Sequence, residues 1–341
     1  MLRTNKIFLL VKPTLQLIST PFPSIFRVIL YRLMGANIMD GATIRAFSIV
    51  IVKNLIMEPK ARIRPFAVIV YPKKLHLKAY SGISFFTLIH GTASLTIGVH
   101  SQISVFVFID LHDNVSFGNW SGPAPFCKIM THGVYWPASW GYTTKYAPVE
   151  IGDFVWIHFN CKIGPGAKIP SNNVIISGST IVSEIRQNGN IIYDNSIKKT
   201  RFPITLMRNI LDDEQIDNFL IDSIKEWAKE KYKNCKLEIL EKENSIILQI
   251  ERKPFLVIHI REGSNRIDKK IPHWLWGYKL SDSDFESHNG TLDFYRILCS
   301  DNPSTLFKSA ISFLRKRYGI RAGEFKHREY CEITPPLINV K

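Results

Sequence analysis

The sequence has few cysteines and no CxxC pair. Five cysteines are spread over 341 residues, at Cys127, Cys161, Cys235, Cys299 and Cys331. An odd number without paired spacing argues against a disulfide framework and against a zinc site built from thiolates. We therefore expect the cysteines to be reduced.

Long apolar runs are also missing. No stretch of about 18 apolar residues is present, the length that a membrane-spanning helix requires. The N-terminal IFLLV is short, is followed by Lys12 and Pro13, and has no cleavage site of the kind that ends a secretory signal. The sequence therefore predicts a cytoplasmic protein without a membrane span, and leaves open a position at the membrane surface.

Acidic residues are scarce in the first part of the chain. The net charge is +15, and residues 1–200 hold 20 Lys and Arg against 8 Asp and Glu. Such a field suits a polyanionic ligand, for example the phosphates of a cofactor or a lipid surface. A basic surface that serves only solubility is the alternative. No nucleic-acid recognition motif is present, so we expect no nucleic-acid partner.

What the sequence does contain is a sixfold repeat. Between Val149 and Glu184 an isoleucine recurs at every sixth position, as Ile151, Ile157, Ile163, Ile169, Ile175 and Ile181. A period of six fits neither a strand, whose period is two, nor an α-helix, whose period is 3.6. It is typical of a stacked solenoid, in which each repeat forms one short parallel strand and a corner. The sequence therefore predicts a mainly β fold, a parallel β-helix.

The same period appears in weaker form from residue 36 onward, with slips that we expect to mark small loops. We predict an N-terminal helical cap at 1–35, the β-helix at 36–185 and a linker at 186–204. The period lapses at 116–148, which predicts a long functional loop rich in Gly, Pro and aromatic residues. Residues 205–341 alternate helical and strand patterns, which predicts an α/β domain of unknown role without a phosphate loop or metal motif.

The cap contains a helical pattern at SIFRVILYRLMG, with Ile25, Ile29 and Leu33 on one face and Gly35 as a stop. Terminal coils of a solenoid need a cap, and this is the expected role of the segment. The alternative is that it lies on a membrane surface.

Residues 131–182 carry a motif that goes beyond the repeat. Thr131-His132 precedes a variable loop, and PVEIGDFVWI then runs from Pro148 to Ile157. This arrangement resembles the hexapeptide-repeat acyltransferases, in particular the maltose/galactoside O-acetyltransferases and the acetyltransferases of polysaccharide gene clusters. The resemblance is specific at 131–182, loose before it and absent from 205 onward. It implies a left-handed parallel β-helix, a homotrimer, and transfer of an acetyl group from acetyl-CoA without a metal.

The resemblance places the general base at His132. A sugar hydroxyl is a poor nucleophile at neutral pH, and a neutral imidazole within hydrogen-bond reach can take its proton as it attacks a thioester. A histidine that only packs in its loop is the alternative. The expected reaction is O-acetylation of a saccharide or glycolipid acceptor in surface polysaccharide biosynthesis.

The resemblance also implies where the two substrates bind. Coenzyme A is expected in a groove between subunits, along Trp156, Lys162, Gly164, Lys168, Ser177, Gly178, Lys198 and Lys199. The acceptor is expected to contact Asn119, Trp136 and Trp140. Each lysine taken singly also fits a solvated surface charge, and the aromatic residues also fit a loop that packs on itself.

Several departures from the family pattern keep other functions open. His158 stands where the family has Gly, Ile176-Ser177 replaces Gly-Ala, and 194–197 replaces the usual exit sequence. Amino-sugar N-acetylation and a non-catalytic glycan-binding or scaffold solenoid therefore remain alternatives. A trimeric carbonic anhydrase would need three converging zinc ligands, and the spacings among His90, His100, His112, His132 and His158 form no ligand motif.

Overall fold

The computed structural model describes residues 11–133, 145–186, 188–194 and 199–203, and then 213–327 with gaps, the longest of which is 261–272. The chain divides into two compact units, residues 1–208 and residues 209–341. The first unit contains the repeat, and the second contains the predicted α/β segment.

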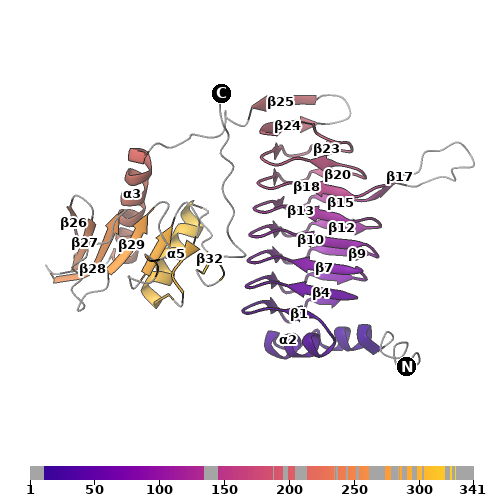
Figure 1. Ribbon diagram of the computed structural model, residues 1–341, viewed down its shortest axis with the longest axis horizontal. Helices are drawn as coiled ribbons and strands as arrows, with labels where there is room; N and C mark the ends of the chain where they lie inside the picture. The colour runs from indigo at the N-terminus through magenta and orange to yellow at the C-terminus, as the bar shows by residue number, and fades with distance from the viewer. Residues whose placement is uncertain are drawn as a thin grey trace, which may run out of the picture. The chain divides into compact units, whose positions relative to one another are not determined.

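The first unit is a parallel β-solenoid with three faces (Figure 1). The first face consists of β1 (Asn37–Ile38), β4 (Asn54–Met57), β7 (Lys74–Leu77), β10 (Ser94–Ile97), β13 (Val115–Phe117), β18 (Val149–Ile151) and β21 (Lys168–Ile169). The second face consists of β2 (Thr43–Ile44), β5 (Arg62–Ile63), β8 (Gly82–Ile83), β11 (Gln102–Ile103), β14 (Gly122–Pro123), β19 (Trp156–Ile157), β22 (Val174–Ile175) and β24 (Asn190–Asp194). The third face consists of β3 (Ile49–Ile51), β6 (Val68–Val70), β9 (Leu88–Gly91), β12 (Phe108–Leu111), β15 (Lys128–Met130), β20 (Lys162–Ile163) and β23 (Thr180–Ile181). The predicted parallel β-solenoid is therefore confirmed, while the hand of the coil stays a prediction.

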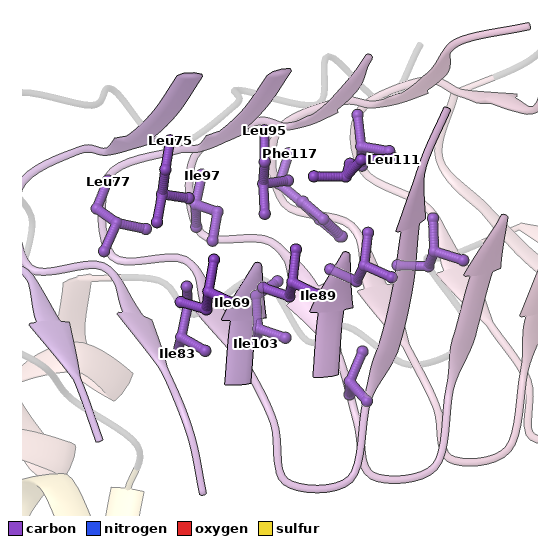
Figure 2. Close-up of a cluster of buried hydrophobic side chains, with 14 of the residues drawn as sticks. Ile69, Leu75, Leu77, Ile83, Ile89, Leu95, Ile97, Ile103, Leu111 and Phe117 are labelled. Atoms are coloured by element: carbon purple, nitrogen blue, oxygen red, sulfur yellow. The ribbon is translucent and has the colours of Figure 1, made fainter. Parts of the chain in front are cut away.

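Columns of aliphatic side chains fill the interior (Figure 2). Ile83 pairs with Ile103 on the second face, and Ile89 pairs with Ile109 on the third, each one coil on. All four side chains are fully buried. Each coil thus buries its branched residues against the coils on both sides, which is how a short repeat obtains a core that it could not form alone.

The slips in the sixfold period come from longer strands. On the first face β7 and β10 are four residues long, and β10 turns both Leu95 and Ile97 inward. Leu95 therefore pairs with a residue 20 positions earlier, Leu75, whereas Ile169 pairs with Ile151, 18 positions earlier. The prediction of small loops was wrong, because two extra residues in a strand add one more inward side chain without adding a loop.

Coil strands also run through the first half of the segment that was predicted to be a loop, 116–148. β13, β14 and β15 lie within or overlap it, and Phe117, Pro123 and Ile129 are buried at six-residue spacing. β16 (His132–Gly133) follows and pairs antiparallel with β17 (Lys145–Tyr146), while residues 134–144 lie outside the described part of the chain. The loop prediction was wrong up to residue 131, because a phenylalanine and a proline replace isoleucine at the inward positions.

The predicted linker, 186–204, contains two strands. β24 continues the second face by pairing parallel with β22, and β25 (Lys199–Pro203) pairs antiparallel with β24. The prediction of an irregular linker was therefore wrong for these residues. The segment ends the solenoid with a strand pair.

Two helices lie across the first coil, residues 11–18 and α2 (Ser24–Leu33) (Figure 1). The Gln16 amide donates to the Val52 carbonyl and accepts from the Val52 N–H, both at 3.1 Å. Arg27 donates to the backbone oxygen and the hydroxyl of Ser48, each at 2.7 Å, and the Tyr31 hydroxyl donates to the Val50 carbonyl. The helices thus satisfy backbone groups that an open solenoid edge would leave unpaired.

The second unit is an α/β fold with one sheet. Its elements are α3 (Asp213–Lys231), β26 (Leu237–Lys242), β27 (Ser245–Ile250), β28 (Lys253–Ile260), β29 (His273–Gly277), β30 (Gly290–Asp293), β31 (Leu298–Cys299), α5 (Thr305–Tyr318) and β32 (Gly323–Glu324). The strands follow one another in sequence order across the sheet. The core joins Trp227 of α3 and Phe307 of α5 to Trp274 of the sheet. The helical pattern of the sequence predicted both helices.

The four described cysteines are free thiols. Cys127 and Cys161 are buried on neighbouring coils, next to the paired residues Lys128 and Lys162. The hydrogen bond with Cys161, together with burial, raises the pKa of the Cys127 thiol, so this side chain stays protonated. Among the described residues, no helix combines the length and the apolar character that crossing a membrane requires.

Candidate active site

The corner that joins the third face to the first carries the Thr-His dipeptide. Thr131 is fully buried directly after β15, and His132 follows at the start of β16. The Thr131 hydroxyl donates to the Asp110 carbonyl at 3.0 Å and accepts the N–H groups of His112 and Asp113 at 2.9 Å. Thr131 therefore connects the His132 corner to the same corner of the preceding coil.

A buried carboxylate lies at the centre of this corner. Asp110, on β12, is only 1% exposed, and its Oδ1 lies 2.7 Å from His112 Nδ1. Its Oδ2 contacts His132 Nδ1, and His90 Nε2 lies 3.7 Å from Oδ1. An ionised carboxylate can only accept hydrogen bonds, so both Nδ1 atoms act as donors and both Nε2 atoms are left as acceptors. We call Asp110, His112 and His132 the histidine cluster.

The His132 ring packs against two other aromatic rings. The His132 ring lies 4.1 Å from the His112 ring and is stacked on Tyr146 of β17 at 5.8 Å, measured between centroids. The side chains of His132 and His112 are 26% and 42% exposed. An oriented imidazole that has access to solvent, and whose Nε2 makes no hydrogen bond to the described residues, is suited to act as a general base.

The histidine cluster is also the group among the described residues that could hold a metal ion. One ligand atom from each of its three residues lies within 4.8 Å of the others. In the present arrangement the imidazole Nδ1 atoms are bonded to the carboxylate. A metal would have to replace both of these hydrogen bonds.

The sequence analysis did not identify Asp110, although its spacing from His90 could have indicated it. It lies 20 residues after His90 and pairs with it in the β9–β12 register. His132 likewise lies 20 residues after His112, and 20 residues is the length of one coil in this part of the solenoid. A search for chemistry-bearing residues at the coil spacing would have brought these four together.

The structure divides the residues expected to bind coenzyme A into two groups. Lys162, Gly164 and Lys168 flank the third-to-first corner, one coil after His132. Lys145 reaches along the same corner, where its Nζ lies 3.3 Å from the Val182 carbonyl oxygen. Trp156, Ser177 and Gly178 instead lie at or near the second-to-third corner, while Lys198 falls outside the described residues and nothing is described of the Lys199 side chain. The residues expected to bind coenzyme A therefore do not all lie at one place within a single chain.

His158 lies at the second-to-third corner and fills part of it. Its ring lies 4.3 Å from the ring of Trp156, and its Nδ1 is 3.5 Å from the Ser177 hydroxyl. Its Nε2 is buried and has no hydrogen-bond partner among the described residues. The replacement of the family's glycine thus places a ring where the resemblance would put open space.

Of the residues expected to bind the acceptor, the structure describes Asn119, which does not lie at the His132 corner. Trp136 and Trp140 lie outside the described residues. Asn119 lies at the first-to-second corner, where its side-chain oxygen accepts the Val99 N–H at 2.9 Å and its own N–H donates to Asp153. In this chain the Asn119 side chain joins neighbouring coils.

No protein-family model matches the sequence, and no curated protein sequence matches it. Among solved structures, the polySia specific acetyltransferase NeuO is similar with 12% identity and a TM-score of 0.38, over 52% of this chain and 84% of that one. The chain contains a hexapeptide-repeat β-solenoid.

Two further solved structures share this similarity. A maltose O-acetyltransferase from Clostridium difficile has 17% identity and a TM-score of 0.29, over 51% of this chain and 73% of that one. A hexapeptide-repeat containing acetyltransferase from Vibrio cholerae, complexed with acetyl coenzyme A, has 14% identity and a TM-score of 0.29, over 59% and 87%.

Proposed function

We propose that this chain is a CoA-dependent O-acetyltransferase. It moves an acetyl group from acetyl-CoA to a hydroxyl of a saccharide or glycolipid in the biosynthesis of surface polysaccharide, in the cytoplasm and as a homotrimer. The observation that carries the proposal is the pairing of the His132 Nδ1 with the buried Asp110 carboxylate. This pairing leaves Nε2 as the base that the reaction requires.

In the proposed reaction His132 acts on the acceptor hydroxyl. Its Nε2 takes the hydroxyl proton while the oxygen attacks the thioester carbonyl of acetyl-CoA. Collapse of the tetrahedral intermediate releases the coenzyme A thiolate, which receives the proton from the imidazolium. Asp110 holds the imidazole in one tautomer and stabilises its charged form.

The basic side chains around the same corner suit the phosphates of coenzyme A. Lys128 and Lys162 are exposed at paired positions on the third face. Lys168 is exposed on the first face, where its Nζ lies 3.7 Å from Glu150 Oε1. Together with Lys145 they give this corner a positive field for an anionic co-substrate.

The test is steady-state kinetics with acetyl-CoA and a saccharide acceptor. We expect His132→Ala to lower kcat by about 10²–10⁴-fold, the contribution typical of a positioned general base. Asp110→Asn should lower it by roughly 10–100-fold, because it removes only the orienting partner. His112→Ala is the matched control, since it shares Asp110 with His132 and should cost less than about tenfold.

If the His132→Ala variant folds, binds acetyl-CoA and turns over as fast as the unaltered chain, the assignment of His132 as the base is refuted. A full loss in His112→Ala with activity retained in His132→Ala would move the role to the other imidazole. Both variants alter half-exposed or exposed side chains, so folding is expected to survive.

A non-catalytic solenoid that binds a glycan or serves as a scaffold is the second candidate. The observation that favours it is His158, whose ring fills the corner beside Trp156 and Ser177. Calorimetry with coenzyme A separates the two candidates. The absence of heat at millimolar coenzyme A favours the scaffold, and saturable binding favours the enzyme.

A further inference from the structure

The apolar face of α2 points away from the solenoid. Ile25, Ile29 and Leu33 recur along one side of the helix and are 71%, 52% and 77% exposed. Arg27 and Tyr31 occupy the opposite side and are fully buried against the first coil. The helix therefore attaches to the solenoid through Arg27 and Tyr31, with Val28 and Leu30 partly buried against the core, and presents Ile25, Ile29 and Leu33 to the surroundings.

Neighbouring side chains enlarge this face. We call the combined surface the apolar end surface; it consists of Ile18, Phe22, Ile25, Phe26, Ile29 and Leu33, all exposed. The helices that carry it lie across the end of the solenoid (Figure 1). Contiguous exposed patches of this kind mark surfaces that bind a partner or a membrane.

The charge around the apolar end surface is strongly positive. Residues 11–74, which form the cap and the first two coils, contain ten Lys and Arg and two Asp and Glu. Arg32, Arg45 and Lys53 are exposed among them. An apolar strip bordered by basic side chains matches the acyl region and the anionic headgroups of a lipid bilayer.

A pocket of about 290 Å³ lies at the same end of the solenoid. Lys12, Gln16, Lys53, Asn54 and Tyr71 contribute to its lining. The Lys12 ammonium group is oriented there by a 2.7 Å hydrogen bond to the Lys53 carbonyl. The ammonium groups of Lys12 and Lys53 and the Asn54 amide carry N–H groups in this concave site, and a lipid phosphate would accept hydrogen bonds from them.

We infer that the apolar end surface docks the chain onto an anionic lipid bilayer. The aliphatic residues of α2 enter the boundary between headgroups and acyl chains, and the basic residues of the first coils lie over the headgroups. The solenoid axis then stands away from the bilayer. His132 follows the fifth coil, so with about 4.8 Å per coil it lies roughly 20 Å from the first coil along the axis, and the helix layer adds to its height above the bilayer.

The inference does not rest on the proposed activity, because it is tested without acetyl-CoA. The full chain is sedimented with vesicles of phosphatidylcholine alone and with vesicles that also contain phosphatidylglycerol. We expect binding to the mixed vesicles at low salt, weak binding to the neutral ones, and loss of binding as salt is raised. The double variant Ile25→Ser/Ile29→Ser should bind at least tenfold more weakly, since it removes two of the inserted side chains.

The matched control is Phe126→Ser, which removes an equally exposed apolar side chain from the fifth coil. It should bind vesicles as the unaltered chain does. Equal binding by the double variant, or no binding to mixed vesicles at low salt, overturns the inference. A changed oligomeric mass of the double variant without a change in vesicle binding also overturns it, because the surface is then an interface between copies.

Discussion

The coils before and after the β16–β17 hairpin differ in their length and in the residue that forms the second-to-third corner. Before the hairpin each coil spans about 20 residues, and a phenylalanine stands at every second-to-third corner: Phe47, Phe66, Phe86, Phe106 and Phe126. Their rings stack along the solenoid with centroids 5.2–5.9 Å apart. After the hairpin the coils span 18 residues, and Asn160 and then Gly178 take the same corner.

The corner residues of both regions have a positive φ. It is 56° at Phe86, 56° at Asn160 and 79° at Gly178. This conformation costs a bulky residue about 1–2 kcal/mol, whereas asparagine and glycine adopt it readily. At the second-to-third corner the early coils offset the strain by stacking, and the late coils avoid it by residue type. The chemistry of the histidine cluster belongs to the early, wider coils, where the sequence repeat is least regular.

The largest expected effect on stability comes from replacing core residues. Ile89 and Ile163 are both buried on the third face, the first in a wide coil and the second in a narrow one. Replacing either with alanine should lower the free energy of unfolding by about 2–5 kcal/mol, and Ile89→Ala should lie at the upper end because the wider coil leaves a larger cavity. Urea denaturation followed by circular dichroism measures both. A smaller loss for Ile89→Ala would show that the wide coils pack more loosely.

A smaller difference is expected for the carboxylates that join neighbouring coils. In the early coils Glu58 accepts hydrogen bonds from His76 Nε2 at 2.8 Å and from the Ala79 N–H at 3.0 Å. In the late coils Glu150 only faces Lys168 at 3.7 Å, with both side chains half exposed. At pH 7 Glu58→Gln should cost about 1.5–3 kcal/mol and Glu150→Gln less than about 1 kcal/mol.

The Glu58 effect should depend on pH. Burial by itself would raise the pKa of Glu58, but the hydrogen bonds from His76 and Ala79 outweigh it and lower the pKa. A lowered pKa means that the stabilisation is complete above the unfolded value, about 4.3, and disappears as the pH falls through the folded value. The difference between the unaltered chain and Glu58→Gln should therefore vanish in acid. A difference that persists there would contradict this account.

The smallest effects are expected at the corners. Phe86→Ala removes two stacking contacts and should cost about 1–2 kcal/mol. Phe86→Gly loses the same contacts but relieves the positive φ, so it should be less destabilising than Phe86→Ala. Asn160→Gly, at the same corner of a late coil, should change stability by a few tenths of a kcal/mol. Thermal melts of the three variants rank them, and a Phe86→Gly chain that is less stable than Phe86→Ala would remove the strain argument.

The sequence predicted the fold best where its repeat is strict. Ile157 and Ile175 lie in the inward column that the period of six requires. The prediction failed at Phe117 and Pro123, because an inward position of a solenoid accepts residues other than isoleucine. The aliphatic stripe of α2 does not by itself indicate which face is buried: the structure buries Arg27 and Tyr31 and leaves Ile25, Ile29 and Leu33 exposed.

The sequence by itself determined that the chain stacks short strands and that Thr131-His132 precedes the returning coil, because both are local patterns. Only the tertiary structure decided that Asp110 lies beside His132, 22 residues away, since the stacking of one coil on the next makes them neighbours. It likewise decided which face of α2 turns outward. That choice depends on which side chains can hydrogen-bond to the unpaired backbone groups at the open edge of the first coil. Hydrophobic spacing alone does not indicate this.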